Sequence, residues 1–240
     1  MTSPQSAYPL SLTGELDPDV GRWLWLLKWL LAIPHFAVLF FLWIGFVLST
    51  VVAGVAILVT GRYPRGIFDF NVGVLRWSWR VGFYSYSALG TDKYPPFALV
   101  DDPTYPARLE VEYPEQLSRG LVLIKWWLLA IPQYVIVAIF TGGAWSAWSD
   151  GGDGWLFASG GGLIGLLVLV AGLALIVTGR YPRSLYDFVL GLNRWVFRVV
   201  AYAGLMTDTY PPFRLDSGSA EPPAATGTTP SLPTAPAPTA

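Results

Sequence analysis

Long apolar runs separated by short polar segments dominate the chain. The first run covers residues 23–59 and is broken only by Lys28 and by the Pro34-His35 pair. A second run covers 121–140 and a third covers 163–177. A transmembrane helix needs about 20 apolar residues, so the first run is long enough for two spans. The pattern therefore predicts two transmembrane hairpins, with spans at about 23–42, 45–60, 120–140 and 162–178.

A different pattern follows each predicted hairpin, at about 66–88 and 184–205. Polar residues recur there at helical spacing and apolar residues cover the remaining positions, which predicts amphipathic helices. We favour a location at the membrane interface, because a crossing helix would carry arginines to the bilayer centre at about 2.5–3.5 kcal/mol each. The alternative, in which these helices cross, would give three spans per half and inverted repeats, as in many transporters.

The second half of the chain repeats the first. Three motifs mark the repeat: a Tyr-Pro segment, a lysine followed by Leu-Leu-Ala-Ile-Pro, and the sequence Thr-Gly-Arg-Tyr-Pro-Arg. They begin at Tyr8, Lys28 and Thr60 in the first half and at Tyr105, Lys125 and Thr178 in the second. Matches of this length predict an internal duplication with pseudo-twofold symmetry, divided into residues 1–100 and 101–215.

The ends of the repeats carry two further predictions. Each half opens with a short alternating segment, Tyr8–Glu15 or Tyr105–Tyr113, which is typical of a strand. From about Asp216 the chain consists mainly of Ala, Pro, Thr, Ser and Gly, so we expect a disordered tail over 216–240. The predicted fold class is an all-α membrane protein with a minor β element.

The amino-acid composition excludes several classes of protein and of functional site. Hydrophobic residues make up 53% of the chain and charged residues only 13%, against about 25% charge in a soluble domain. A net charge of −1 argues against nucleic-acid binding by a positive field, and the absence of cysteine excludes disulfides and thiol chemistry. The single histidine, His35, has Gln133 at its place in the second half. We expect no metal and no cofactor, and we expect His35 to help satisfy backbone groups freed by Pro34; a proton relay is the alternative.

Basic residues indicate an orientation. Neither predicted hairpin tip contains a lysine or arginine, and basic residues flank the predicted spans. The positive-inside rule then predicts a multi-pass protein of the cell membrane with both termini cytoplasmic. Lys28 and Lys125 lie just inside the predicted spans, and we expect both to snorkel to this interface. The Thr-Asp pairs at Thr91 and Thr207 are expected to form turns and a structural clasp between the halves.

Arginines at repeated positions form the sharpest candidate site. Arginine binds phosphate through paired N–H groups and keeps its charge when partly buried, which predicts binding of anionic lipid headgroups. The alternative is membrane anchoring with internal ion pairs; Asp69 and Asp187, each four residues after an arginine, are expected to pair structurally rather than act as acids or bases. The candidate arginines are Arg62, Arg65, Arg76, Arg80, Arg180, Arg183, Arg194 and Arg198.

The motifs together resemble a known family. Tyr-Pro-x-Arg-Leu, Lys-Trp-Trp-Leu-Leu-Ala-Ile-Pro, Thr-Gly-Arg-Tyr-Pro-Arg, Asp-Phe-x-x-Gly-x-x-Arg-Trp-x-x-Arg and Tyr-Pro-Pro-Phe resemble DUF4389, uncharacterised integral membrane proteins of actinobacteria and archaea. The resemblance covers about 8–215, and the first half departs from it where Ser11 replaces the arginine found at Arg108. It implies a multi-span protein and transfers no catalytic residue.

No nucleotide-binding loop or hydrolase motif is present in the sequence. The predicted function is a non-enzymatic membrane scaffold or accessory protein whose arginine-rich cytoplasmic face contacts anionic lipid and a protein partner. The alternative is a small transporter or channel built from inverted repeats. Homo-oligomerisation is left open, and no nucleic-acid partner is expected.

Overall fold

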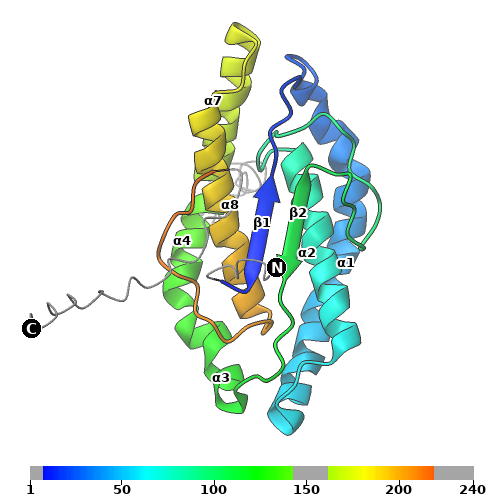
Figure 1. Ribbon diagram of the computed structural model, residues 1–240, viewed down its shortest axis with the longest axis vertical. Coiled ribbons are helices and arrows are strands. Elements are labelled where there is room, and N and C mark those ends of the chain that lie inside the picture. The colour runs from blue at the N-terminus through cyan, green and yellow to red at the C-terminus, as the bar shows by residue number, and fades with distance from the viewer. Residues whose placement is uncertain (1–7, 143–161, 219–240) are drawn as a thin grey trace, which may run out of the picture.

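The computed structural model describes residues 8–142 and 162–218, which form helices packed beside a single two-stranded sheet (Figure 1). The elements in chain order are β1 (Leu10–Gly14), α1 (Trp25–Thr60), α2 (Arg65–Tyr84), β2 (Ala107–Val111), α3 (Arg119–Ile124), the π-helical turn η1 (Lys125–Leu129), α4 (Ile131–Thr141), α7 (Leu163–Thr178) and α8 (Arg183–Ala203). The mostly helical fold with a minor β element agrees with the prediction.

The first predicted hairpin is wrong, because α1 is one continuous helix of 36 residues. Residues 43–45, where the predicted break falls, include one glycine, Gly45, but no proline and no polar turn, and one glycine costs a helix only about 1 kcal/mol. Pro34 also lies inside the helix. At about 1.5 Å per residue α1 is about 54 Å long, well beyond a hydrocarbon core of about 30 Å. It ends at Gly61, whose φ of 74° is the left-handed conformation that glycine adopts readily.

The matching apolar run of the second half is divided. The segments α3, η1 and α4 form its first part, with a bend of 47° before α4. After residues 143–161, which lie outside the described part of the chain and include most of the predicted hairpin tip, α7 forms the second part. Among the described helices, α1 alone is long and apolar enough to cross a membrane, and α3–η1–α4 also qualifies if it is taken as one bent span.

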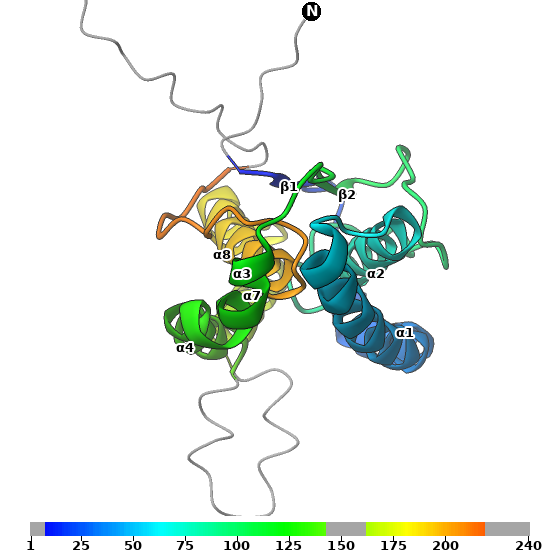
Figure 2. The ribbon, with the colours of Figure 1, turned by 90° about the horizontal axis from the view of Figure 1, so that it is seen from below.

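The elements form layers. The ribbon of β1 and β2 packs on α2 and α8, and α1, α4 and α7 pack against α2 or α8 from other sides. Figure 2, seen along the long axis, places the ribbon on one side of α2 and α8, with α1 and α4 on the other side. The apolar helices are therefore separated from the ribbon by the amphipathic ones.

The strand pairing exchanges segments between the two halves. The strands are antiparallel, with Leu10 opposite Val111 and Gly14 opposite Ala107. β2 packs on α2, whereas β1 packs on α8 at the far end of the chain. The first strand therefore belongs, by its packing, with the helices of the second half, and the boundary at residue 100 does not separate two packing units.

The two halves run in opposite directions. In Figure 1, α1 descends to the turn that leads into α2, whereas α7 rises to the turn that leads into α8. The Thr-Gly-Arg-Tyr-Pro-Arg turns, at 60–65 and 178–183, consequently lie at opposite ends of the long axis. The two turns therefore do not lie side by side, as the prediction of one arginine-rich face assumed, because the first half has one long helix in place of the predicted hairpin.

The described chain continues into the predicted tail. Asp216 is only 8% exposed, and its carboxylate lies 2.8 Å from the guanidinium of Arg198. The ordered region therefore extends past Asp216, because this one acidic residue has buried partners. The rest of the predicted tail, 219–240, lies outside the described residues.

Candidate functional site

Four of the eight predicted arginines are exposed and belong to the two turns: Arg62, Arg65, Arg180 and Arg183. The guanidinium of Arg65 stacks over the ring of Tyr113 at 4.1 Å from its centre. Because the turns lie at opposite ends of the molecule, these arginines form two separate pairs rather than one site.

The other four arginines lie along α2 and α8. Arg76, Arg80 and Arg194 donate to backbone carbonyls, and Arg198 donates to the Asp216 carboxylate. Arg80, Arg194 and Arg198 are at most 1% exposed, and Arg76 is half-buried. Arg76 Nε donates to the Leu109 carbonyl at 2.9 Å, and Arg194 Nε donates to the Leu12 carbonyl at 2.8 Å. These side chains fasten the ribbon to the amphipathic helices, so the predicted arginine-rich face of eight residues does not form.

Arg80 holds the segment that leads into β2. Its guanidinium donates to the Ala98 carbonyl at 3.1 Å and also to the Val100 carbonyl. Burial lowers the pKa of Arg80, while the nearby carboxylates of Asp101 and Asp102 act in the opposite direction.

Two buried tyrosines also attach the strands to the amphipathic helices. Tyr105 donates to the Arg80 carbonyl at 3.4 Å, and Tyr8 donates to the Arg198 carbonyl at 3.3 Å. Burial raises the pKa of both hydroxyls, so each remains a protonated donor. Each strand is therefore anchored through its Tyr-Pro segment to the helix that it covers.

The predicted pairing of Asp69 and Asp187 is not formed. Within the described residues, neither carboxylate lies within 4.0 Å of a basic side chain. Arg65 instead stacks on Tyr113, and an ion pair between residues four apart on a helix is worth only about 0.2–0.5 kcal/mol.

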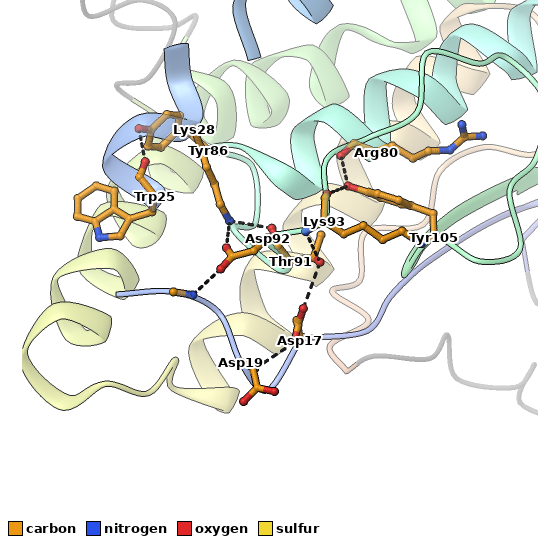
Figure 3. Close-up of polar contacts among 11 residues, drawn as sticks. Asp17, Asp19, Trp25, Lys28, Arg80, Tyr86, Thr91, Asp92, Lys93 and Tyr105 are labelled. Atoms are coloured by element: carbon orange, nitrogen blue, oxygen red, sulfur yellow. Dashed lines mark hydrogen bonds and ion pairs between the residues drawn. The ribbon is translucent and has the colours of Figure 1, made fainter. Parts of the chain in front are cut away.

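Two buried lysines form an ion pair that recurs in both halves. Lys28 and Lys125 are fully buried rather than snorkelling. Lys28 Nζ lies 2.8 Å from Asp92 and donates to the Thr91 carbonyl at 2.7 Å, as Figure 3 shows. Asp92 also accepts from the Gly21 backbone N–H at 2.6 Å. The Thr-Asp pair is thus a clasp within one half, between the start of α1 and the segment after α2.

The second half repeats this clasp. Lys125 Nζ lies 2.8 Å from Asp208 and donates to the Thr207 carbonyl at 2.9 Å, and Asp208 accepts from the Ser118 backbone N–H at 2.6 Å. In the sequence, the only sign of this pairing is that the lysine and the Thr-Asp pair both recur in the two halves. We missed the pairing because the partners are more than sixty residues apart.

His35 has a packing partner of its own. Its Nδ1 accepts a hydrogen bond from Trp77 Nε1 at 3.1 Å, and its ring stacks on Phe97 at 3.9 Å. At the matching place Gln133 accepts from Trp195 Nε1 at 2.7 Å and donates to the Pro211 carbonyl at 3.0 Å. Two different side chains accept from equivalent tryptophans, which supports a structural role for both.

A one-residue difference between the halves explains η1. The interval from Lys28 to His35 is seven residues, whereas that from Lys125 to Gln133 is eight. A π-helical turn accommodates one extra residue. Because η1 accommodates the extra residue, Lys125 and Gln133 both contact the segment after α8. Lys28 and His35 contact the segment after α2 in the same way.

An apolar groove opens between the halves. It has a volume of about 580 Å³ and lies between α1, the α3–η1–α4 segment and the end of α8. Its walls include Phe46, Val51 and Val55 from α1, and Val122 and Trp126 from the opposite segment. Volumes of roughly 300–1,000 Å³ are typical of sites for small ligands.

A basic pocket is lined by residues that are close in sequence to those of the groove. It measures about 410 Å³ and is lined by Thr60, Gly61, Arg62, Gln116, Leu117 and Arg119. Leu58 of the groove is two residues before Thr60, and Val122 is three residues after Arg119. Among the described residues, Arg62 and Arg119 are exposed and form no ion pair.

The described residues contain no group of three or more His, Cys, Asp or Glu side chains able to hold a metal ion. The groove and the basic pocket together present an apolar lining and two exposed guanidinium groups.

Comparison with known proteins identifies one family. Residues 22–98 and 155–214, one stretch in each sequence-related half, match the family described as a domain of unknown function, DUF4389. No curated protein and no solved structure matches the chain.

Proposed function

Because the chain belongs to the DUF4389 family, whose function is unknown, we propose from its geometry that it is a non-enzymatic membrane scaffold. It is a duplicated protein whose apolar helices lie within one leaflet of the cell membrane, with both termini on the cytoplasmic side. The ribbon and the polar segments face water, where they contact a protein partner.

The observation that carries this proposal is the separation of exposed apolar side chains from the ribbon. Large apolar side chains are exposed along the whole of α1, including Phe41 at 70% and Val59 at 70%. Exposed residues of the same kind follow α3–α4 and α7, as Trp127 and Leu173 illustrate. A contiguous apolar surface of this kind on a monomer is typical of a membrane or protein interface.

The ribbon supports an orientation parallel to the membrane. It lies near the middle of the long axis in Figure 1, on the outer side of α2 and α8. A two-stranded sheet leaves one edge of each strand unpaired, and such edges do not occur in lipid because their backbone groups lack partners. If the long axis crossed the membrane, this ribbon would lie at the depth of the hydrocarbon core.

One pair of cysteine variants tests the orientation. Gly66 and Ser184 are exposed and occupy matching positions near the starts of α2 and α8. These two helix starts lie at opposite ends of the long axis. The chain contains no native cysteine. With Gly66→Cys and Ser184→Cys made separately, an impermeant maleimide should label neither in intact cells and both in inverted membrane vesicles. Glu110→Cys in β2 should behave in the same way.

The second candidate, a small transporter or channel, has one observation in its favour, the opposite direction of the two halves. If the long axis crossed the membrane, that arrangement would be an inverted repeat. The arginines expected to line a path are instead bound to backbone carbonyls. Labelling of Gly66→Cys and Ser184→Cys from opposite sides of the membrane would refute the scaffold proposal and favour the transporter.

A further inference from the structure

We propose that the apolar groove and the basic pocket beside it bind one anionic phospholipid, with an acyl chain in the groove and its phosphate between Arg62 and Arg119. This inference rests on the proposed membrane location and adds a defined ligand site to it.

The groove suits an acyl chain because its lining is almost entirely apolar. Its polar side chains are Thr50, Trp43, Trp126 and Tyr134, and the rest are aliphatic, phenylalanine or glycine. The walls come from two segments far apart in sequence, so the groove exists only in the folded protein.

The groove is open because the two halves differ at one position. Trp25 and Val122 occupy matching places, three residues before Lys28 and Lys125. At one contact between the halves the Trp25 ring covers Gly172, where an added Cβ would lie 3.1 Å from the ring. At the corresponding contact, an added Cβ at Gly54 would lie 3.2 Å from Leu205 and 3.7 Å from Val122, and the smaller side chain of Val122 leaves room beside α1. A tryptophan at position 122 would therefore occupy the space that we assign to the acyl chain.

The end of the groove is complementary to a phosphate. Arg62 follows α1 and Arg119 begins α3, and both line the basic pocket. Guanidinium groups form paired, charge-assisted hydrogen bonds to phosphate oxygens. Since these two make no ion pair within the described chain, an anionic headgroup would supply the missing counter-charge.

The site can be tested by native mass spectrometry of the detergent-purified, delipidated full chain titrated with phosphatidylglycerol or phosphatidylcholine. We expect one phosphatidylglycerol per chain, bound at least tenfold more tightly than phosphatidylcholine. Val122→Trp should weaken phosphatidylglycerol binding at least tenfold, and so should Arg62→Gln combined with Arg119→Gln. Equal binding of the two lipids would overturn the inference.

A matched control uses the other end of the molecule. Arg22→Gln combined with Arg180→Gln removes the corresponding two charges, and it should change phosphatidylglycerol binding by less than twofold. An equal loss in this control would mean non-specific surface attraction and would overturn the site. Binding of inorganic phosphate alone as tightly as the lipid, unaffected by Val122→Trp, would overturn the role of the groove.

A second variant guards against misfolding of Val122→Trp. Val55 lines the groove and is 59% exposed, so Val55→Trp can cover the groove without entering the core. It should weaken phosphatidylglycerol binding at least fivefold while the thermal unfolding midpoint stays unchanged. Unchanged lipid binding in Val55→Trp and Val122→Trp together would refute the inference.

Flotation with liposomes separates this inference from the proposed function. The wild type, Val122→Trp and the Arg62/Arg119 double variant should all float with vesicles, because the apolar layer remains intact. If they float but no lipid binding depends on the groove, only the lipid site fails. If the wild type does not float, the membrane scaffold itself fails.

Discussion

Removal of the Asp208 charge tests the buried clasp of the second half. Lys125 is fully buried and lies 2.8 Å from Asp208, whose side chain is 24% exposed. In Asp208→Asn the amide keeps nearly the same shape and can still accept from the Ser118 N–H, but the ammonium loses its counter-charge. The change therefore isolates the electrostatic part of the clasp.

The expected loss of stability follows from this geometry. Two unit charges 2.8 Å apart attract by about 6 kcal/mol at an effective dielectric constant of 20, which is an upper limit. Removing one partner of a fully buried pair costs about 3–5 kcal/mol. Because Asp208 is partly exposed and Lys125 keeps the Thr207 carbonyl, we expect a loss of about 2–3 kcal/mol. For a domain of this size that lowers the unfolding midpoint by about 4–12 °C.

The assay is thermal unfolding in detergent, followed by tryptophan fluorescence. Asp69→Asn is the control, because this exposed aspartate makes no ion pair within the described chain, and it should change stability by less than about 0.5 kcal/mol. Lys125→Met combined with Asp208→Asn should cost less than the sum of the single changes, because no uncompensated charge remains. Additive losses, or a loss in Asp208→Asn no larger than in Asp69→Asn, would refute the reasoning.

Three further predictions concern the π-helical turn η1, the His35–Trp77 hydrogen bond and the contacts of Arg80. Deletion of Trp127, the extra residue within η1, should cost less than about 2 kcal/mol because the π-turn relaxes to an α-turn, whereas deletion of Leu30 should cost more by rotating His35 away from Trp77; chemical denaturation compares the two. His35→Gln should stay within about 1 kcal/mol of wild type, as Gln133 fills the matching role, while His35→Leu should lose about 1–3 kcal/mol by leaving the Trp77 N–H unpaired, and equal unfolding midpoints for these two variants would contradict this. Arg80→Met should lose about 2–4 kcal/mol and expose the segment before β2 to faster hydrogen exchange, because the carbonyls of Ala98 and Val100 lose their donor; unchanged exchange there would show that Arg80 does not hold the segment.

Local patterns of the sequence determined much of the secondary structure. The amphipathic spacing predicted α2 and α8, and the alternation within Tyr105–Tyr113 predicted the strand that the structure has at Ala107–Val111. These features depend on residues a few positions apart, so they can be read without knowing what lies across the fold. The sequence also shows no helix breaker near Gly45, which agrees with the continuous helix α1. The hairpin was predicted there only because the apolar run is longer than one membrane span.

Only the tertiary structure decided how these elements associate. The exchange of β1 onto α8, the burial of Lys28 beside Asp92 and the opening of the groove at Val122 each join segments far apart in the chain. Their formation depends on the summed free energy of many non-local contacts, which no single motif encodes. The sequence thus determined that the motifs occur twice, whereas the fold decided that the two arginine turns lie at opposite ends of the molecule.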